Sequence, residues 1–592
     1  MSNDAAAKPN NFLRSIIERD IETGANSGRS YAGSPGDAAH HAGWPEDSAA
    51  VRLRFPPEPN GFLHVGHAKS IFLNLGLVRD YGGVCHLRYD DTNPEKEERR
   101  YVDAIADVMA WLGWTSDPNE PDNVYFASDY FDFMYLAAEY LISAGLAYVD
   151  EQSADEMRAS RGDFSTPGTG SPFRSRPVAE SLNRFREMRA GSYPDGAMVL
   201  RAKIDMASPN MNLRDPTLYR IRRATHHNTS DRWCIYPMYA FAHPIEDALE
   251  RITHSLCTLE FEDQRPFYEW LLEALADGGL LARPLPKQYE FGRLNLSYVV
   301  TSKRKLRQLV EGGHVEGWDD PRMPTLVGMR RRGYTPESIR ATVESSGVSK
   351  QNAWLDYSVL DGYLRDDLEG KAARASAVLD PLELKLVNFG DVFGSEEHRE
   401  LCSAPTYPHA PEMGMRQLTL GPRLWIERDD FVEIPPKGYH RLFPGNKVRL
   451  KAGYVIECTG CEKGADGQVT AVLANVMPDT KSGTPGAAAV KVKGVITWVG
   501  MHEAVAAEVR LYDRLFTEAQ PDVGGRDHLT VLNPRSLRVV EAWLEPSLGD
   551  VPAEMHFQFE RHGYFVTDRH DHQTTGKRVF NKITGLRDNF GK

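Results

Sequence analysis

The chain has 592 residues, of which 41% are hydrophobic and 26% charged, so it is large enough for roughly three to five globular domains. Its net charge of −13 argues against nucleic-acid binding by the surface as a whole, so RNA contact would need local basic patches. The sequence lacks a bilayer-length apolar run and a signal-peptide pattern, and its six cysteines indicate a reducing compartment rather than a disulfide framework.

Residues 1–49 form the predicted N-terminal region. The apolar spacing from Asn11 to Ile21 predicts one amphipathic helix. Residues 24–49 are rich in Gly, Ala, Ser and Asp, a composition typical of a flexible connection.

A Rossmann-like α/β pattern follows, in two halves at 50–125 and 233–290. Residues 126–232 contain many Gly, Pro, Ser and Arg residues, and we expect an inserted domain there. The predicted strands lie at 51–55, 84–89 and 233–241, and the predicted helices at 97–112, 131–144, 178–189, 243–256 and 262–276.

The remainder divides into a helical part and a β-rich part. Residues 291–370 have mainly helical periodicity and carry a Thr-Ser-Lys loop. Residues 371–592 change to short alternating strands separated by turn signals, which predicts two β-barrels.

The most informative stretch runs from Arg54 to Ser70, Arg-Phe-Pro-Pro-Glu-Pro-Asn-Gly-Phe-Leu-His-Val-Gly-His-Ala-Lys-Ser. A strand, a Gly-containing turn and a helix start create an anion site, because the free N–H groups and the positive dipole end face the ligand. His64 and His67 could donate to a phosphate there, and Gly66 would allow close approach of a nucleotide. A chance His-x-Gly-His with two capping histidines is the plainer interpretation of those four residues alone.

A second basic loop, Thr301-Ser302-Lys303, follows a predicted strand. A lysine on a mobile loop could neutralise a pyrophosphate leaving group. A surface lysine and arginine cluster is the alternative, since charge runs usually face solvent.

Taken together, these motifs resemble the two signatures of class I aminoacyl-tRNA synthetases. The Pro-Glu-Pro-Asn lead-in and the stretch Trp-Cys-Ile-Tyr-Pro-Met-Tyr at 233–239 are similar to the glutaminyl family, from about residue 10 to the C-terminus. The resemblance implies ATP-dependent activation of glutamine, with Mg²⁺ on the phosphates, and transfer to the 3′ end of tRNA(Gln). It assigns catalytic roles to His64, His67 and Lys303.

The resemblance also implies the other site residues, position by position. ATP contacts fall on Glu58, Pro59, Asn60, His64, Val65, Gly66, His67, Ala68, Lys69, Ser70, Thr258, Arg293, Leu294, Thr301, Ser302 and Lys303. Glutamine contacts fall on Arg54, Asp90, Tyr239 and His243, and an acceptor-binding role falls on the insert. Contacts with tRNA fall on Asp263, Lys350, Gln351, Arg374, Arg441, Gln558 and Arg561.

The sequence departs from the family pattern at four positions. Ala240 and Ala242 replace the usual Asp and Thr, Thr301 replaces the usual Met, and Lys451 stands where Arg is common. Ala240 and Ala242 affect a supporting hydrogen bond, and Thr301 affects the packing of the loop. Lys451 affects a fork-like contact that an arginine would make.

Three alternative functions remain. A glutamyl enzyme of the same subfamily usually has Cys at position 243 and Arg at position 257, whereas this chain has His243 and Cys257. A non-catalytic tRNA-binding protein would not need His64, His67 and Lys303. A small-molecule nucleotidyltransferase would have no use for C-terminal barrels.

The remaining expectations concern metals, location and assembly. Cys458 and Cys461 have too few ligands nearby for a zinc site, so we expect no protein-bound metal. The family resemblance implies a cytoplasmic monomer without membrane contact.

Overall fold

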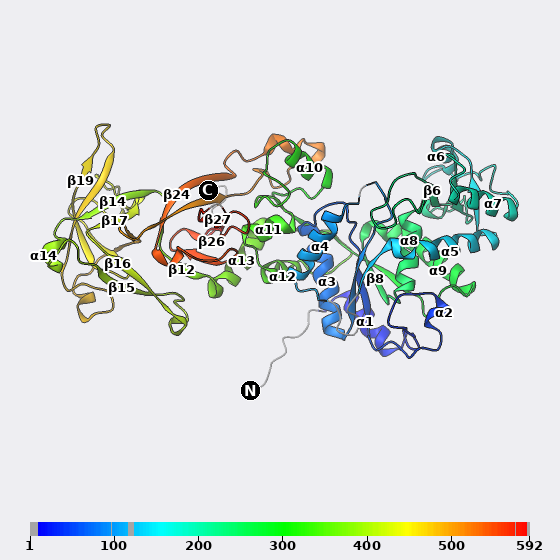
Figure 1. Cartoon of the computed structure of the whole chain (residues 1–592), viewed down its shortest axis with the longest axis horizontal. Coiled ribbons are helices and arrows are strands. Elements are labelled where there is room, and N and C mark those ends of the chain that lie inside the picture. The colour runs from blue at the N-terminus through cyan, green and yellow to red at the C-terminus, as the bar shows by residue number, and fades with distance from the viewer. Residues whose placement is uncertain (1–9, 96, 116–122, 575, 589–592) are drawn as a thin grey trace. The chain divides into compact units, whose positions relative to one another are not determined.

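The computed structural model describes residues 10–95, 97–115, 123–574 and 576–588 (Figure 1). The chain divides into two compact units. One comprises Met1–Asn295 with Val343–Leu355, and the other comprises Leu296–Thr342 with Asp356–Lys592.

The first unit is built on parallel strands. β1 (Arg52–Phe55), β2 (Val84–Tyr89) and β3 (Val124–Phe126) pair in that order, and β8 (His254–Thr258) pairs with β9 (Lys287–Phe291). The amide of Thr253 donates to the carbonyl of Arg52 at 2.9 Å, which joins the two sets. β1 and β2 are buried throughout, as expected of parallel strands covered on both faces. The predicted α/β architecture is confirmed.

The helices of this unit are α1 (Phe12–Glu22), α3 (Val65–Tyr81), α4 (Arg99–Trp111), α5 (Phe131–Ser143), α6 (Ala154–Arg161), α7 (Val178–Arg189), α8 (Tyr239–Leu249) and α9 (Arg265–Asp277). Helices α1, α4, α5, α7 and α9 lie close to their expected positions, whereas α6 was not expected and α8 is displaced. Figure 1 shows α5, α8 and α9 close together, beside the strands of the insert.

Three strands of the expected insert, β4 (Ala147–Asp150), β5 (Val199–Ala202) and β6 (Thr217–Ile221), form an antiparallel sheet with β7 (Ile235–Pro237), which begins just after the expected boundary. Its apolar side chains form one core with those of α8 and α9. The insert therefore packs on the second half of the α/β pattern rather than forming a core of its own.

Two expectations for this unit were wrong. The apolar run at 233–241 was expected to be one strand, but β7 ends at Pro237 and α8 begins at Tyr239. The helix expected at 243–256 ends at Leu249, and β8 follows from His254. A short apolar run satisfies both periods, and packing between the sheet and α9 decides which one forms.

Residues 24–49 are not the flexible connection that their composition indicated. Asp47 accepts from Arg29 at 2.8 Å, and it pairs with Arg52 of β1 at 3.0 Å. The short helix α2 (Ala38–His41) ends at His41, which is 1% exposed and bonds the carbonyl of Leu249 at 3.3 Å. Scattered polar side chains thus fasten this segment to the sheet, a feature that average composition does not reveal.

The second unit starts with helices α10 (Lys303–Glu311), α11 (Leu326–Arg332), α12 (Pro336–Ser345) and α13 (Tyr357–Lys371). Two seven-stranded sheets follow. One has the order β12-β25-β26-β27-β23-β24-β13 and contains β12 (Ala373–Ala375), β13 (Ala377–Val378), β23 (Val505–Tyr512), β24 (Leu537–Leu544), β25 (His556–Phe559), β26 (Gly563–Thr567) and β27 (Val579–Thr584).

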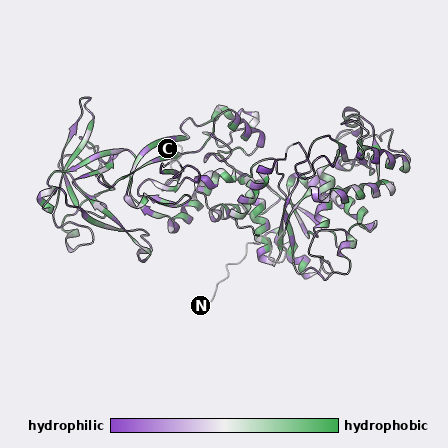
Figure 2. Cartoon of the chain, in the orientation of Figure 1, coloured by the Kyte–Doolittle hydropathy of each residue, from purple (hydrophilic) through white to green (hydrophobic). Residues whose placement is uncertain are grey.

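The other sheet has the order β21-β18-β19-β20-β14-β17-β22. It contains β14 (Pro381–Leu386), β17 (Arg423–Glu427), β18 (Lys447–Leu450), β19 (Val455–Lys463), β20 (Val469–Val476), β21 (Gly494–Ile496) and β22 (Val499–Gly500). Burial alternates along β14. Figure 2 shows hydrophilic and hydrophobic residues mixed along the strands of the β-rich region. The second sheet is thus inserted in sequence between strands of the first, and the two barrel-like sheets confirm the prediction for this region.

All six cysteines lie in the described part of the chain, and each is a free thiol. Within the same described ranges, no helix is both long and apolar enough to cross a membrane.

Candidate functional site

The two histidines of the first motif cap helix α3. The Nδ1 atom of His64 accepts from the amide of Gly66 at 3.1 Å, and Nδ1 of His67 accepts from the amide of His64 at 3.0 Å. Their ring centroids are 3.9 Å apart. A Cβ atom on Gly66 would lie 2.9 Å from the ring of His64, so glycine is needed here for the cap itself.

These hydrogen bonds determine the protonation of both rings. Because each Nδ1 accepts a backbone N–H, the ring proton of a neutral histidine must be on Nε2. Burial lowers the pKa of His67 to about 4 and the pKa of His64 well below its usual value. Both rings are therefore neutral at pH 7, and each has an Nε2–H donor for an anion at the start of the helix.

Asp90 lies immediately after β2, where parallel sheets bind ligands. It is 3% exposed, and its carboxylate accepts from the hydroxyl of Thr92 at 2.8 Å. Burial, together with the charges of Glu58 and Asp91, raises the pKa of Asp90 to about 7. An ammonium group would stabilise the ionised form of this carboxylate.

Tyr239 and His243 lie one turn apart on α8, with ring centroids 5.2 Å apart and planes 5° from parallel. Arg54 donates to Nδ1 of His243 at 3.3 Å, so the ring proton is on Nε2, which donates to the side-chain oxygen of Gln288 at 3.3 Å. Burial lowers the pKa of His243 to about 4. The predicted site histidine is thus a neutral ring whose Nε2–H is a donor.

Arg54 is 1% exposed, and its guanidinium is held by protein groups. It pairs with Asp247 at 2.9 Å and donates to the hydroxyl of Ser255 at 2.7 Å and to the carbonyl of Leu256 at 2.9 Å. Arg54 therefore acts on the site by orienting His243.

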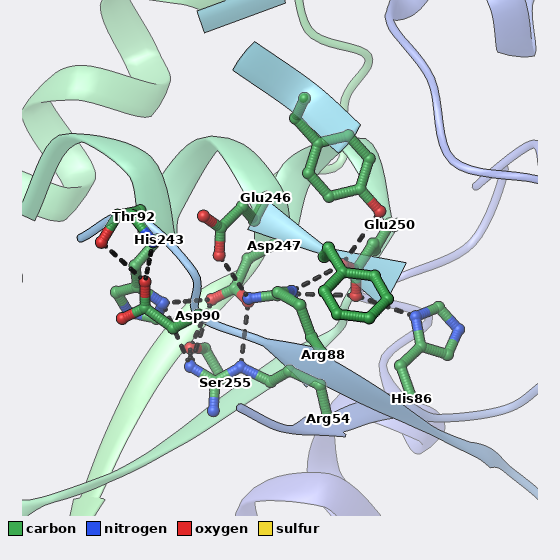
Figure 3. A network of polar contacts seen from close by, with 12 residues as sticks. Arg54, His86, Arg88, Asp90, Thr92, His243, Glu246, Asp247, Glu250 and Ser255 are labelled. Atoms are coloured by element: carbon green, nitrogen blue, oxygen red, sulfur yellow. Dashed lines mark hydrogen bonds and ion pairs between the residues drawn. The ribbon is translucent and has the colours of Figure 1, made fainter. Parts of the chain in front are cut away.

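A second buried arginine extends this network beneath α8 (Figure 3). Arg88 pairs with Glu250 at 2.5 Å and with Asp247 at 2.7 Å, and Glu250 also accepts from His86 at 2.9 Å. The four side chains are fully buried. Paired charges at this depth hold α8 in a fixed position over β1 and β2.

Sequence reasoning did not identify Asp247, Ser255 and Gln288. Each is buried and contacts Arg54 or His243. Helical spacing could have indicated Asp247, because it lies four residues after His243 within the helix expected at 243–256.

The other predicted ATP residues of the first unit fall into three groups. Val65, Ala68 and Lys69 are buried within α3, so side-chain contact with a nucleotide is disfavoured for them. Asn60 bonds Glu58 in the turn before α3. Thr258 ends β8, Arg293 lies between β9 and β10 (Leu294–Leu296), and Leu294 begins β10. Pro59 precedes α3, and Ser70 lies within that helix.

The predicted Thr301-Ser302-Lys303 loop belongs to the second unit. Ser302 is the N-cap of α10, and Lys303 is the first residue of that helix. The nearby Lys305 pairs with Asp522 at 2.5 Å, so this basic segment also contributes an ion pair to the fold.

Three predicted tRNA contacts of the first unit lie on exposed segments. The carbonyl of Asp263 accepts from Asn210 of the insert at 2.8 Å, and Lys350 pairs with Glu262 at 2.8 Å. Gln351 is exposed beside Lys350.

Arg561 and Arg441 meet at one buried carboxylate in the second unit. The guanidinium of Arg561 donates two hydrogen bonds of 2.8 Å to the carboxylate of Asp430, and Arg441 pairs with the same carboxylate at 3.1 Å. β25 ends at Phe559, and Arg561 has a φ of 74°, so the strand alternation that would separate Arg561 from Gln558 is broken here. The side-chain oxygen of Gln558 is buried without a hydrogen-bond partner.

A cavity of about 1000 Å³ opens beside this cluster and is lined by Arg441 and Arg561. Further cationic side chains in its wall are Arg332, Arg514, Arg535, Arg538, Lys582 and Arg587. Arg374 lies on β12, paired in register with Gln558 of β25. The backbone pairing thus brings the predicted contacts Arg374 and Gln558 together within this unit, and Gln558 lies three residues before Arg561 along the chain. Arg561 also lines the cavity, whose wall contains Asp361, Asp513 and Asp588 beside its cationic side chains.

Comparison with known proteins gives a consistent result across the chain. Residues 50–363 match the catalytic domain of tRNA synthetases class I (E and Q), and residues 372–477 and 495–568 match their anticodon-binding domains. The glutamine–tRNA ligase of Bordetella pertussis is 61% identical over 98% of both chains. Those of Ralstonia nicotianae and Cupriavidus taiwanensis are 60% identical, over 99% and 100% of this chain and 98% of each relative. The chain therefore belongs to the class I tRNA synthetases of the glutamate and glutamine group.

Proposed function

We propose that the chain is a glutaminyl-tRNA synthetase. It activates L-glutamine with ATP to glutaminyl-adenylate and transfers the acyl group to the 3′ end of tRNA(Gln), yielding Gln-tRNA(Gln), AMP and diphosphate. The near full-length similarity to glutamine–tRNA ligases supports this reaction. We also propose a cytoplasmic monomer, the state that the family resemblance implies.

The preference for glutamine over glutamate is supported by one observation: His243 is neutral, and the charge of the adjacent Arg54 is compensated. The pairing of Arg54 with Asp247 leaves its positive charge compensated, and His243 is uncharged at pH 7. Burying the γ-carboxylate of glutamate here would cost several kcal/mol without a compensating cation. An amide only needs hydrogen-bond partners, which Tyr239 and His243 could supply directly or through a water molecule.

The adenylation site combines anion donors with one ammonium acceptor. The Nε2–H groups of His64 and His67 would bind the phosphates as negative charge develops, while Asp90 holds the α-ammonium of glutamine. The carboxylate of glutamine then attacks the α-phosphate of ATP, and diphosphate leaves. These histidines offer N–H donors rather than oxygen ligands, so Mg²⁺ is expected to arrive on the phosphates of ATP, whose charge it neutralises.

Lys303 would neutralise the leaving diphosphate, and Arg374, Gln558 and Arg561 would read the anticodon. Bases of a single-stranded loop are read through hydrogen bonds to their exposed edges, and Gln558 has a buried oxygen that needs a donor. Asp263, Lys350 and Gln351 lie on exposed segments, and we propose that they contact the acceptor stem.

The deciding experiment is an aminoacylation assay with glutamine and glutamate against both cognate tRNAs. We expect charging of tRNA(Gln) with glutamine and at least a hundredfold lower efficiency with glutamate, in line with sites that read a polar group. Efficient charging with glutamate would reject the proposal in favour of a glutamyl enzyme. Tight tRNA binding without any charging would favour a non-catalytic binder.

A further inference from the structure

Asp91, the residue after the proposed ammonium-binding Asp90, is held by two separate segments of the first unit. Asp91 is 0% exposed. Its carboxylate accepts from the amide and hydroxyl of Ser128 at 2.8 and 2.6 Å, from Nε2 of His227 at 3.0 Å and from the side-chain amide of Asn228 at 3.0 Å. His227 and Asn228 come from the turn between β6 and β7 of the insert.

The same turn also holds the backbone of Asp91. Nδ1 of His226 accepts from the amides of Asn228 and Thr229 at 3.1 and 3.2 Å, so its proton is on Nε2. Nε2–H then donates to the carbonyl of Asp91 at 2.6 Å. His226 is 1% exposed, which protects this bond from competition with water.

These bonds determine where Asp90 lies. The amide of Asp90 donates to the carbonyl of Pro57 at 3.1 Å, and the carbonyl of the following residue, Asp91, is the one held by His226. We propose that the 226–229 turn of the insert positions Asp90, and thereby couples the insert to recognition of the α-ammonium of glutamine. The inference rests on the proposed function, in which the insert binds the acceptor end of the tRNA.

A metal ion is the alternative explanation of this cluster. Asp91, Glu97, His226 and His227 offer ligand atoms within 4.8 Å of one another. However, Nε2 of His226 must carry a proton to satisfy the carbonyl of Asp91, because two backbone amides occupy Nδ1. A protonated nitrogen cannot be a ligand, and the carboxylate of Asp91 is already fully hydrogen-bonded. The geometry therefore favours a hydrogen-bonded clamp.

The test is the double variant His227→Ala/Asn228→Ala, which removes two donors to Asp91 without substituting Asp90, His64 or Tyr239. Thr225→Ala is the matched control, because its hydroxyl bonds Asp231 in the same turn at 2.7 Å. The single variant His227→Ala serves if the double variant does not fold. The readouts are the KM values for glutamine and ATP, the Kd for tRNA(Gln), and inhibition by glutaminol-adenylate with and without its α-ammonium.

For the double variant we expect a rise of about tenfold in the KM for glutamine, with the KM for ATP and the Kd for tRNA(Gln) changed less than twofold. The preference for the inhibitor with the ammonium over the one without it should fall by a similar factor, since only Asp90 is misplaced. Thr225→Ala should match the wild type. A structural defect would instead weaken both inhibitors equally.

Two outcomes would overturn the inference. One is an unchanged inhibitor preference in the double variant while the wild type charges tRNA(Gln) normally. The other is a stoichiometric divalent ion in the purified wild type, measured by elemental analysis and lost in His227→Ala, which would make the cluster a metal site. Failure of the wild type to charge tRNA(Gln) would instead count against the proposed function itself.

Discussion

Two clusters of arginines around buried carboxylates, one in each unit, differ in how completely the charges are compensated. Arg54 and Arg88 surround Asp247, and the side chains of all three are at most 1% exposed. Arg441 and Arg561 meet at Asp430, which is fully buried, but their own side chains are 40% and 29% exposed.

The pKa shifts of the two acids have opposite directions. Burial alone would raise the pKa of Asp247, but the charges of Arg54 and Arg88 hold it below its usual value. Burial raises the pKa of Asp430 despite its pairing with Arg561. The charges of the first cluster are thus fully compensated within the buried fold. The second cluster retains exposed guanidinium N–H donors, which can exchange a protein acceptor for an acceptor on a ligand.

The largest expected effect tests the first cluster. Arg88→Met leaves Glu250 and Asp247 with less compensation in a dry environment, and should lower the free energy of unfolding by about 3–5 kcal/mol. Arg441→Met is the matched change in the second cluster and should cost at most about 1 kcal/mol, because that side chain is partly in water. Denaturant unfolding followed by circular dichroism gives both values, and equal losses would remove the distinction.

Lys303→Ala tests the proposed role of this lysine in neutralising the leaving diphosphate. We expect ATP–pyrophosphate exchange in the presence of tRNA to slow by roughly 10²–10³-fold, as when one transition-state donor is removed. The Kd for tRNA should change little. Lys305→Ala is the control on the same helix, since its ammonium pairs with Asp522. Unchanged exchange in Lys303→Ala would reject the phosphate role.

Arg561→Lys tests whether the exposed donors of the second cluster read a base. Lysine cannot reproduce the two-pronged contact, so we expect a loss of about 1–3 kcal/mol in kcat/KM for cognate tRNA. The loss should be smaller for a tRNA already altered at the middle anticodon base. Both enzymes are measured on both tRNAs, and an equal loss on the two would mean that Arg561 only holds the backbone.

The smallest expected effect is a pH dependence from Asp90. With a pKa of about 7, its carboxylate is mostly protonated at pH 6 and mostly ionised at pH 8. The KM for glutamine should therefore fall by roughly tenfold across this range, while the KM for ATP should not follow the same curve. A glutamine KM that is flat between pH 6 and pH 8 would contradict the ammonium role.

The same carboxyl affects stability in the opposite sense. Between about pH 4 and pH 7 the folded chain binds the proton of Asp90 more tightly than the unfolded chain does. Its contribution to the free energy of unfolding is therefore lost as the pH rises through this window. Subtracting the unfolding profile of Asp90→Asn from that of the wild type isolates this contribution.

Much of this molecule follows from local sequence. The strand of β2, the helices α5 and α7, the His-Val-Gly-His cap and the change to short alternating strands after residue 371 each have a periodicity or motif that neighbouring residues determine. Anion binding at the start of α3 also follows from local sequence, because a glycine turn before a helix creates an anion site in any context.

The tertiary structure decided what those residues do to one another. Tyr239 and His243 share a helix because the packing of α8 overrides an ambiguous apolar run. The tautomer of His243 depends on Arg54, which is 189 positions away in sequence. Residues 24–49 pack because the carboxylate of Asp47 meets Arg29 and Arg52. Charge compensation depends on the distances between charged groups in the folded chain. Composition and periodicity contain no information on these distances.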